Sequence, residues 1–263
     1  MTILIKLGGS LVTDKLVANS FRRDMVRQIA AQVATLFANA DGRRLVLGHG
    51  SGSFGHVAAR RYRTLQGVVS AKERLGMARV GAVAAELSGL ILAELLAAEL
   101  PALRFPPSAL LTTRDRRIAS LETRPLLSAL QQGSLPLVHG DVALDSQVGG
   151  AIVSTEAVFA ALVEPLDVSE IILLGEVAGV LDDDGMVIPR ITPATFPALK
   201  PWLGGASGID VTGGMLHKVQ AMVELVARQP GLTVTIADGR RADVLLDLLL
   251  RQRALGTRIA AAF

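Results

Sequence analysis

The segment TILIKLGGS, residues 2–10, sets a pattern that the rest of the chain repeats: an apolar run, a glycine turn, then helical periodicity. The apolar run is typical of a buried strand. Residues 22–37 follow the turn with apolar side chains at three- and four-residue spacing, which predicts a helix. Four further strands are predicted by the same criterion, at residues 44–52, 135–144, 170–181 and 232–239.

Helices are predicted between these strands, the longest of them at residues 74–100. The others lie at residues 125–133, 154–166, 212–229 and 242–250, and one begins near Val57. This alternation implies parallel strands joined by crossover helices. We therefore expect an α/β fold, a three-layer αβα sandwich whose open, mainly parallel sheet has helices on both faces.

The glycine turns fall at the carboxyl ends of the predicted strands, which is where sheets of this kind bind their ligands. The segment VEPLDV, residues 163–168, is a plausible boundary between two parts of the chain. We expect residues 1–165 to bind the acceptor and form a dimer contact, and residues 166–263 to bind the nucleotide.

The composition narrows the class of protein. Half of the 263 residues are hydrophobic, the net charge is +3, and aromatic residues make up only 3%. Few aromatic side chains means few stacking platforms for bases, which argues against a nucleic-acid partner. The absence of cysteine excludes thiolate chemistry and fits a reducing cytoplasm. The apolar stretch at residues 81–100 contains Glu86, Glu94 and Glu99, so we expect a buried helix and no membrane partner.

Four glycine segments stand out: KLGGS (6–10), HGSGSFGH (49–56), HGD (139–141) and DVTGGMLHK (210–218). A glycine turn between a strand and a helix exposes backbone N–H groups that bind phosphate, although a single turn fits a simple tight bend equally well. None of the four has the P-loop or dinucleotide-binding spacing. Only five of the 27 cationic residues are lysine, and three of these, Lys6, Lys15 and Lys218, lie in or beside glycine segments. Four glycine segments that can bind anions, together with three lysines, indicate that the protein binds more phosphate groups than one nucleotide carries.

In this order and spacing, KLGGSLVTDK, HGSGSFGH, HGD and DVTGGMLHK resemble the amino acid kinase superfamily, and within it the isopentenyl phosphate kinases. The resemblance extends from residue 3 to about residue 240, and the histidine that ends SFGH favours this branch. It implies ATP-dependent phosphorylation of isopentenyl phosphate to isopentenyl diphosphate in isoprenoid synthesis. It also implies Mg²⁺ bridging the ATP phosphates and a homodimer.

The motifs suit that reaction chemically. An acceptor phosphate is already ionised near neutral pH, so no general base is needed. The difficulty is the repulsion between two anions brought into line, and catalysis must come from positioning and electrostatic stabilisation. The glycine segments supply amides and lysines, and no obvious base.

The resemblance assigns roles to individual residues. Lys6 and Lys218 match lysines that contact the nucleotide phosphates, Lys15 matches the lysine beside the transferring phosphoryl group, and His56 matches the histidine that binds the acceptor phosphate. The implied ATP-binding set is Lys6, Gly8, Gly9, Ser10, Gly52, Glu176, Gly179, Gly214 and Lys218. The implied acceptor-binding set is Gly50, Ser51, Gly55, His56, Gly140 and Asp141. No residue is assigned as a metal ligand.

The chain departs from the family pattern at three places. Ser51 replaces the middle one of three glycines, Ser154–Glu156 replace Ser-Gly-Asp, and Gly175–Gly179 replace Thr-Asp-Val-Asp-Gly. Two of the residues with assigned roles also have a purely structural alternative: Lys15 could form a solvent-exposed ion pair with Asp14, and His56 could cap a helix.

Two other functions therefore stay open. One is a kinase of another small anion, such as fosfomycin, whose kinases share a similar loop and histidine, or an acyl phosphate acceptor. The other is a non-catalytic nucleotide sensor. The small and apolar residues at 76–83, among them Met77, Val80 and Gly81, suit a short prenyl tail and favour isopentenyl phosphate.

Overall fold

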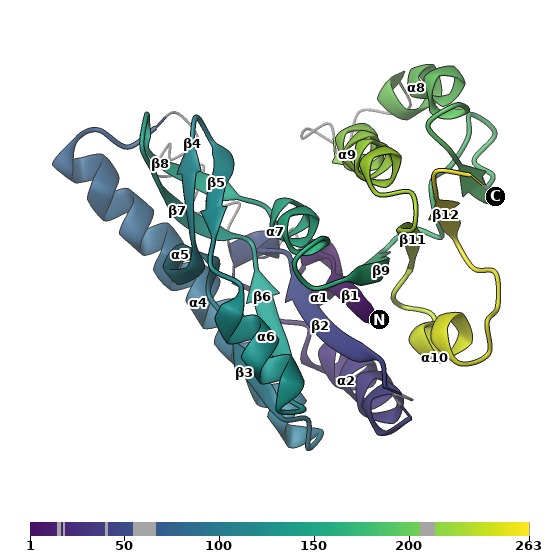
Figure 1. The fold of residues 1–263 in the computed structure, drawn as a ribbon, viewed down its shortest axis with the longest axis horizontal. Coiled ribbons are helices and arrows are strands. Elements are labelled where there is room, and N and C mark those ends of the chain that lie inside the picture. The colour runs from purple at the N-terminus through teal and green to yellow at the C-terminus, as the bar shows by residue number, and fades with distance from the viewer. Residues whose placement is uncertain (15–16, 18, 40–41, 55–66, 206–213, 263) are drawn as a thin grey trace.

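The structure is a computed structural model that describes the chain except residues 15–16, 18, 40–41, 55–66, 206–213 and 263 (Figure 1). An eight-stranded sheet crosses the molecule in the order β10-β12-β11-β9-β1-β2-β6-β3. Its strands are β1 (Thr2–Leu7), β2 (Arg44–His49), β3 (Ala102–Arg104), β6 (Leu135–His139), β9 (Val168–Gly175), β10 (Arg190–Ile191), β11 (Thr233–Asp238) and β12 (Thr257–Ile259). All neighbouring pairs are parallel except β11 with β12.

Helices cover both faces of this sheet, which confirms the expected three-layer sandwich. Alternating residues of β1 show the two faces: Ile3 and Ile5 point into one core, and Leu4 points into the other. The first core contains the short α1 (Gly9–Val12) with α2 (Arg23–Ala38), α4 (Ala71–Ala97) and α10 (Val244–Leu249). The second contains α6 (Arg124–Gln131), α7 (Thr155–Leu162), α8 (Phe196–Gly205) and α9 (Gly214–Arg228).

A second, four-stranded sheet was not predicted. Its order is β5-β4-β7-β8, with β4 (Leu111–Arg114), β5 (Arg117–Leu121), β7 (Asp141–Asp145) and β8 (Gly149–Val153), and the short α5 (Pro107–Leu110) precedes β4. The prediction of one strand at residues 135–144 was therefore wrong. The chain leaves the large sheet at His139, turns at Gly140 and enters the small sheet at Asp141. The HGD segment marks this turn, but the single glycine between two apolar runs does not show that the chain changes sheet there.

The longest helix, α4, is long and apolar enough by length and composition to cross a membrane. In this structure it lies along the large sheet (Figure 1), with Leu87, Ile91 and Leu95 buried in the core. Its Glu94 carboxylate is also buried, and accepts hydrogen bonds from Arg23 and Arg27 of α2 at 2.5 and 2.7 Å. Paired in this way, the charge is compatible with the interior of a globular protein.

The two parts of the chain meet inside the large sheet, where β1 pairs with β9. Residues 1–165 contribute β1, β2, β6 and β3, and residues 166–263 contribute the other four strands. Because β1, β2, β6, β9 and β11 are parallel, their carboxyl ends lie along one edge. The described residues of the KLGGS, HGSGSFGH and HGD segments lie at that edge.

Candidate active site

Two glycine turns touch each other, backbone against backbone, where β1 and β2 end. A Cβ added to Gly9 would lie 2.5 Å from the amide nitrogen of Gly52, and one added to Gly50 would lie 2.8 Å from the amide nitrogen of Gly9. The third strand end joins them, because the Gly8 amide donates to the carbonyl of Leu174 at 2.8 Å. Side chains are excluded from these contacts, so glycine is required here for packing.

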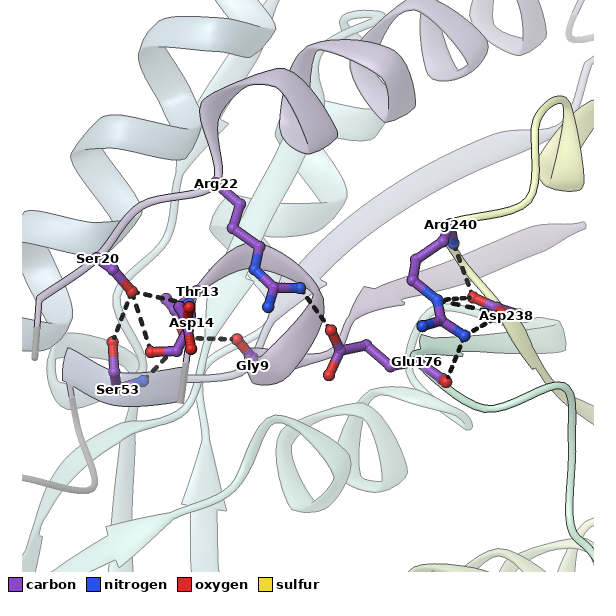
Figure 2. A network of polar contacts seen from close by, with 9 residues as sticks. All are labelled: Gly9, Thr13, Asp14, Ser20, Arg22, Ser53, Glu176, Asp238 and Arg240. Carbon is purple, nitrogen blue, oxygen red and sulfur yellow. Dashed lines mark hydrogen bonds and ion pairs between the residues drawn. The ribbon is translucent and has the colours of Figure 1, made fainter. Parts of the chain in front are cut away.

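The contact leaves amides available at the start of α1. The first N–H groups of a helix have no partner within the helix, and in α1 these belong to Gly9 and Ser10. The helix itself is held by Thr13, whose hydroxyl donates to the Gly9 carbonyl at 2.8 Å and accepts from the Ser53 amide at 2.9 Å (Figure 2). The two turns are thus joined by hydrogen bonds as well as by close packing.

After α1, the side-chain hydroxyl of Ser20 is hydrogen-bonded to the backbone of Asp14. The Ser20 side chain accepts from the Asp14 amide at 2.7 Å and lies 3.0 Å from the Asp14 carbonyl, to which it donates (Figure 2). Residues 14 and 20 are therefore fixed next to each other. Lys15 belongs to this segment and lies outside the described residues, as do Gly55 and His56.

Two of the predicted lysines converge on a carboxylate that was not predicted. Lys6, buried in β1, contacts Glu156 in the first turn of α7, with 2.5 Å between Nζ and Oε1. Burial alone would raise the pKa of Glu156, but the ammonium groups of Lys6 and Lys218 outweigh it and hold the pKa below its usual value. Lys218 comes from α9, so one carboxylate links cations from both parts of the chain.

A second ion pair crosses the same edge. Arg22, which precedes α2, contacts Glu176, which follows β9, with 2.5 Å between Nη1 and Oε1 (Figure 2). The Glu176 carbonyl accepts from Arg240 at 2.8 Å, and Arg240 also pairs with Asp238 at the end of β11. Glu176 was predicted to bind ATP, but its side chain in this structure is held by an arginine.

Two histidines lie buried next to the loops of the predicted acceptor site. His49 ends β2 and His139 ends β6, and their rings meet edge to face with centroids 5.2 Å apart. Among the described residues, neither ring nitrogen of His139 nor Nε2 of His49 has a hydrogen-bond partner. Burial lowers the pKa of His49 to about 3, helped by His139 and by the charges of Lys6 and Arg104. Burial also lowers the pKa of His139, although Asp141 opposes it.

The HGD segment is held tightly by backbone contacts. The Gly140 amide donates to the His49 carbonyl at 3.3 Å, and the Thr155 hydroxyl donates to the same carbonyl at 2.6 Å. Asp141 is buried, and its carboxylate accepts from the amides of Val142 and Ser108 at 2.8 and 3.2 Å. Its carboxylate therefore anchors the start of the small sheet and α5.

The predicted wall for an apolar tail packs against the small sheet. Val80 of α4 and Val142 of β7 are buried together, with Met77, Val83 and Ile152 packed on them. A Cβ on Gly81 would come 3.0 Å from the Val142 side chain. The wall therefore has two sides, α4 and the β7–β8 hairpin, and the sequence indicated only the first.

The remaining predicted residues are spread along the same edge. Ser51 is half-buried between Gly50 and Gly52, and Gly214 begins α9 as described. Gly179 is buried, and a Cβ there would lie 2.7 Å from the Thr257 hydroxyl and from the Val187 side chain, which gives this glycine a packing reason. No group of three or more His, Asp or Glu side chains suited to a metal ion occurs in the part of the chain that the structure describes.

The sequence pattern did not indicate two residues of this site, Glu156 and Arg22. Glu156 stands where the resembling family has aspartate, and this departure was the available signal. Arg22 offered none, because it is one of many arginines and lies outside every glycine segment.

Comparisons with known proteins agree with this geometry. Residues 1–238 match the amino acid kinase family. The chain is 34% identical to an isopentenyl phosphate kinase of Haloferax volcanii over 86% of this chain and 88% of that protein. It is 28% identical to one of Methanocaldococcus jannaschii, over 83% and 85% of the two chains.

Solved structures give the same result. A structure described as isopentenyl phosphate kinase superposes with a TM-score of 0.82 at 26% identity, covering 99% of this chain and all of that chain. The match over nearly the whole of both chains extends to residues 239–263, beyond the part of the sequence that matches the family.

The close contact between the turns predicts that one added methyl group will lower the stability of the protein considerably. Gly9→Ala should lower the free energy of unfolding by about 3 kcal/mol, because the new Cβ would meet backbone atoms that have no room to move. The matched control is Gly231→Ala in the exposed turn before β11, where no atom lies within 4 Å of the added Cβ. Urea unfolding of both variants measures this. Equal stabilities would show that the turns do not pack as described.

The buried histidines predict a loss of stability in mild acid. The folded state keeps His49 neutral down to about pH 3, whereas the unfolded chain protonates it below about 6.5, so stability is complete above 6.5 and falls with pH below it. At pH 5 this one ring should cost about 2 kcal/mol. Unfolding measured between pH 7.5 and 5 should show a shallower dependence for His49→Gln, whereas His217→Gln, at an exposed position, should keep the wild-type slope.

Proposed function

The chain belongs to the amino acid kinase family, and we propose that it transfers the γ-phosphoryl group of ATP to isopentenyl phosphate, giving isopentenyl diphosphate and ADP. The observation that carries this proposal is the convergence of Lys6 and Lys218 on Glu156, beside the glycine turns at the ends of β1 and β2. Cations and free amides gather there, which is the requirement for bringing two phosphates together.

The transfer itself needs no proton to be removed. An oxygen of the acceptor phosphate attacks the γ-phosphorus, the bond from that phosphorus to the β–γ bridging oxygen breaks, and ADP leaves with the electron pair. The barrier lies in the repulsion between the two anions and in the charge on the transferring group. Lysine ammonium groups and backbone amides lower that barrier in a site that excludes water.

Glu156 has a specific part in this arrangement. An ammonium group has three N–H donors, so Lys6 retains its contact with Glu156 while donating to a phosphate oxygen. The carboxylate thereby fixes the direction of Lys6, and its charge offsets the repulsion between Lys6 and Lys218 before the nucleotide arrives. Glu156 is thus a positioning residue.

The other roles follow the sequence comparison. Lys15 stabilises the transferring phosphoryl group, and His56 donates to the acceptor phosphate held by Gly50, Ser51 and Gly55. The wall formed by α4 and the β7–β8 hairpin takes the prenyl tail. In this proposal residues 1–165 bind the acceptor and residues 166–263 bind the nucleotide.

Magnesium enters as part of the nucleotide substrate. Of the carboxylates at this edge, Glu156 holds Lys6, Glu176 holds Arg22 and Asp141 holds backbone amides. Mg²⁺ commonly keeps several waters and binds through substrate phosphates. Mg-ATP therefore brings its own ion, and the cytoplasm, where we place the enzyme, supplies it.

The direct test of the function is incubation with Mg-ATP and a panel of acceptors. We expect turnover of isopentenyl phosphate. Turnover of fosfomycin alone would identify a different kinase, and nucleotide binding without turnover of any acceptor would identify a sensor. The product is measured as isopentenyl diphosphate by mass spectrometry, with ADP release measured in parallel.

Two variants separate the steps. Lys15→Ala should lower kcat about 100-fold, because its charge is needed most during transfer. His56→Ala should raise the KM for the acceptor about tenfold with little change in the KM for ATP. Lys72→Ala, which removes an exposed lysine of α4, is the matched control and should leave both constants unchanged. Weakened binding at an unchanged kcat for Lys15→Ala would contradict its assigned role.

We also infer a homodimer that forms through α4 and β3. The outer face of α4 presents a stripe of small and apolar residues at helical spacing, interrupted by the exposed Glu86, and β3 is the edge strand of the large sheet and exposes Leu103. The stripe consists of Leu75, Ala78, Ala82, Gly89, Ala93 and Leu96. Small residues at its centre allow two helices to approach closely, and the exposed leucines at its ends gain by burial.

Sedimentation velocity tests the dimer. The wild-type protein should sediment with twice the mass of one chain, and Ala82→Glu should give monomers because it places a charge at the centre of the stripe. Ala198→Glu, at an exposed position of α8, is the matched control and should remain dimeric. A monomeric wild type, or a dimer unaffected by Ala82→Glu, would contradict this interface.

A further inference from the structure

The Arg22–Glu176 ion pair needs an explanation beyond stability. Its side chains are 36% and 29% exposed, and ion pairs with this much access to water contribute little to folding. It is nevertheless held in place from both sides. The Arg22 amide donates to the Val12 carbonyl at the end of α1, and the Arg22 carbonyl accepts from Val26 in the first turn of α2.

The other partner is fixed by the opposite part of the chain. The Glu176 carbonyl accepts from Arg240, and the carbonyl of the preceding residue, Gly175, accepts from the Gly239 amide at 2.8 Å. Figure 2 shows the resulting line of contacts from Asp238 through Arg240 and Glu176 to Arg22. The line runs beside α1.

The position of Glu176 relative to the glycine turn is the decisive point. Leu174, two residues earlier, accepts the Gly8 amide, and a Cβ on Gly8 would lie 3.5 Å from the Cα of Gly175. Glu176, the next residue, therefore brings a carboxylate into the neighbourhood of the turn that is expected to receive the phosphates of ATP. Alone, that negative charge would repel the nucleotide.

The surrounding charges leave Arg22 as the group that balances it. Arg240 also lies near Glu176, but its guanidinium is hydrogen-bonded to Asp238 at 2.7 to 3.2 Å and donates to the backbone carbonyl of Glu176, so the Glu176 carboxylate adds only a minor Coulombic attraction to it. Asp238 and Arg240 cancel each other, and so do Glu176 and Arg22. With Arg22 neutralised, the Glu176 carboxylate would lose the cation that is in direct contact with it.

We propose that Arg22 is an affinity and positioning residue for the nucleotide, which neutralises the Glu176 carboxylate beside the Gly8–Gly9 turn and joins α2 to the loop after β9. This inference rests on the proposed function, because it takes the turn as the site of the ATP phosphates. Arg22 acts through Glu176 and touches no reacting atom.

The test is a double-mutant cycle with Arg22→Gln, Glu176→Gln and the double variant. Binding of Mg-ATP is measured by calorimetry without any acceptor, and KM and kcat are measured with isopentenyl phosphate. Arg22→Gln should weaken nucleotide binding about tenfold, with kcat and the KM for the acceptor nearly unchanged. The double variant should return to within about twofold of the wild type, because it removes the unpaired carboxylate.

Two results would overturn the proposal. A double variant that binds ATP as weakly as Arg22→Gln would mean that Arg22 contacts the nucleotide directly. A fall in melting temperature together with loss of kcat would mean that the pair is structural. Arg124→Gln, which breaks an exposed pair with Glu122 elsewhere on the chain, is the matched control and should change neither binding nor turnover.

The calorimetric measurement keeps the two hypotheses apart. If the wild-type protein binds Mg-ATP but does not phosphorylate isopentenyl phosphate, the proposed function fails while the cycle still tests Arg22. If turnover is normal and the cycle shows no rescue, the function stands and the assignment of Arg22 fails.

Discussion

The site depends on the contact between two backbones at the ends of β1 and β2. Gly9 lies so close to Gly50 and Gly52 that a side chain at Gly9 or Gly50 would strike main-chain atoms of the opposite turn. That contact brings the start of α1 next to the loop that leads toward His56. In the proposed reaction these two turns hold different phosphates. The distance between the donor and acceptor phosphates is therefore set by the spacing of β1 and β2 and by the close backbone contact that glycine, which has no Cβ, allows.

Two cations at this edge already face carboxylates before any ligand binds. Lys6 faces Glu156 and Arg22 faces Glu176, and each pair joins residues distant in the sequence. The two pairs differ in their surroundings. The first is largely buried, so it fixes the geometry of its cation, whereas the second is partly open to water and adjusts the local potential.

The sequence predicted the sandwich because each strand and helix had its own periodicity. It did not predict the small sheet, because only one residue separates β6 from β7 and the two strands read as one continuous strand. At the site, the order of the glycine segments indicated that Lys6 and Lys218 belong together. Glu156 was missed because an acidic residue in the first turn of a helix is common for reasons of the helix dipole. Arg22 was missed because its partner is more than 150 residues away, and periodicity carries no such information. Lys15, Gly55 and His56 lie outside the described residues, so their roles stay predictions.

The turn at Gly140 has a mechanical consequence. Only Gly140 separates β6 of the large sheet from β7 of the small sheet, so the start of the β7–β8 hairpin is fixed relative to the large sheet. Its far end is secured differently, by Val68, whose amide donates to the Val148 carbonyl at 2.8 Å next to the left-handed Gly149. The position of Val68 therefore sets where the far end of the hairpin lies, and with it the extent of the wall that is proposed to take the prenyl tail.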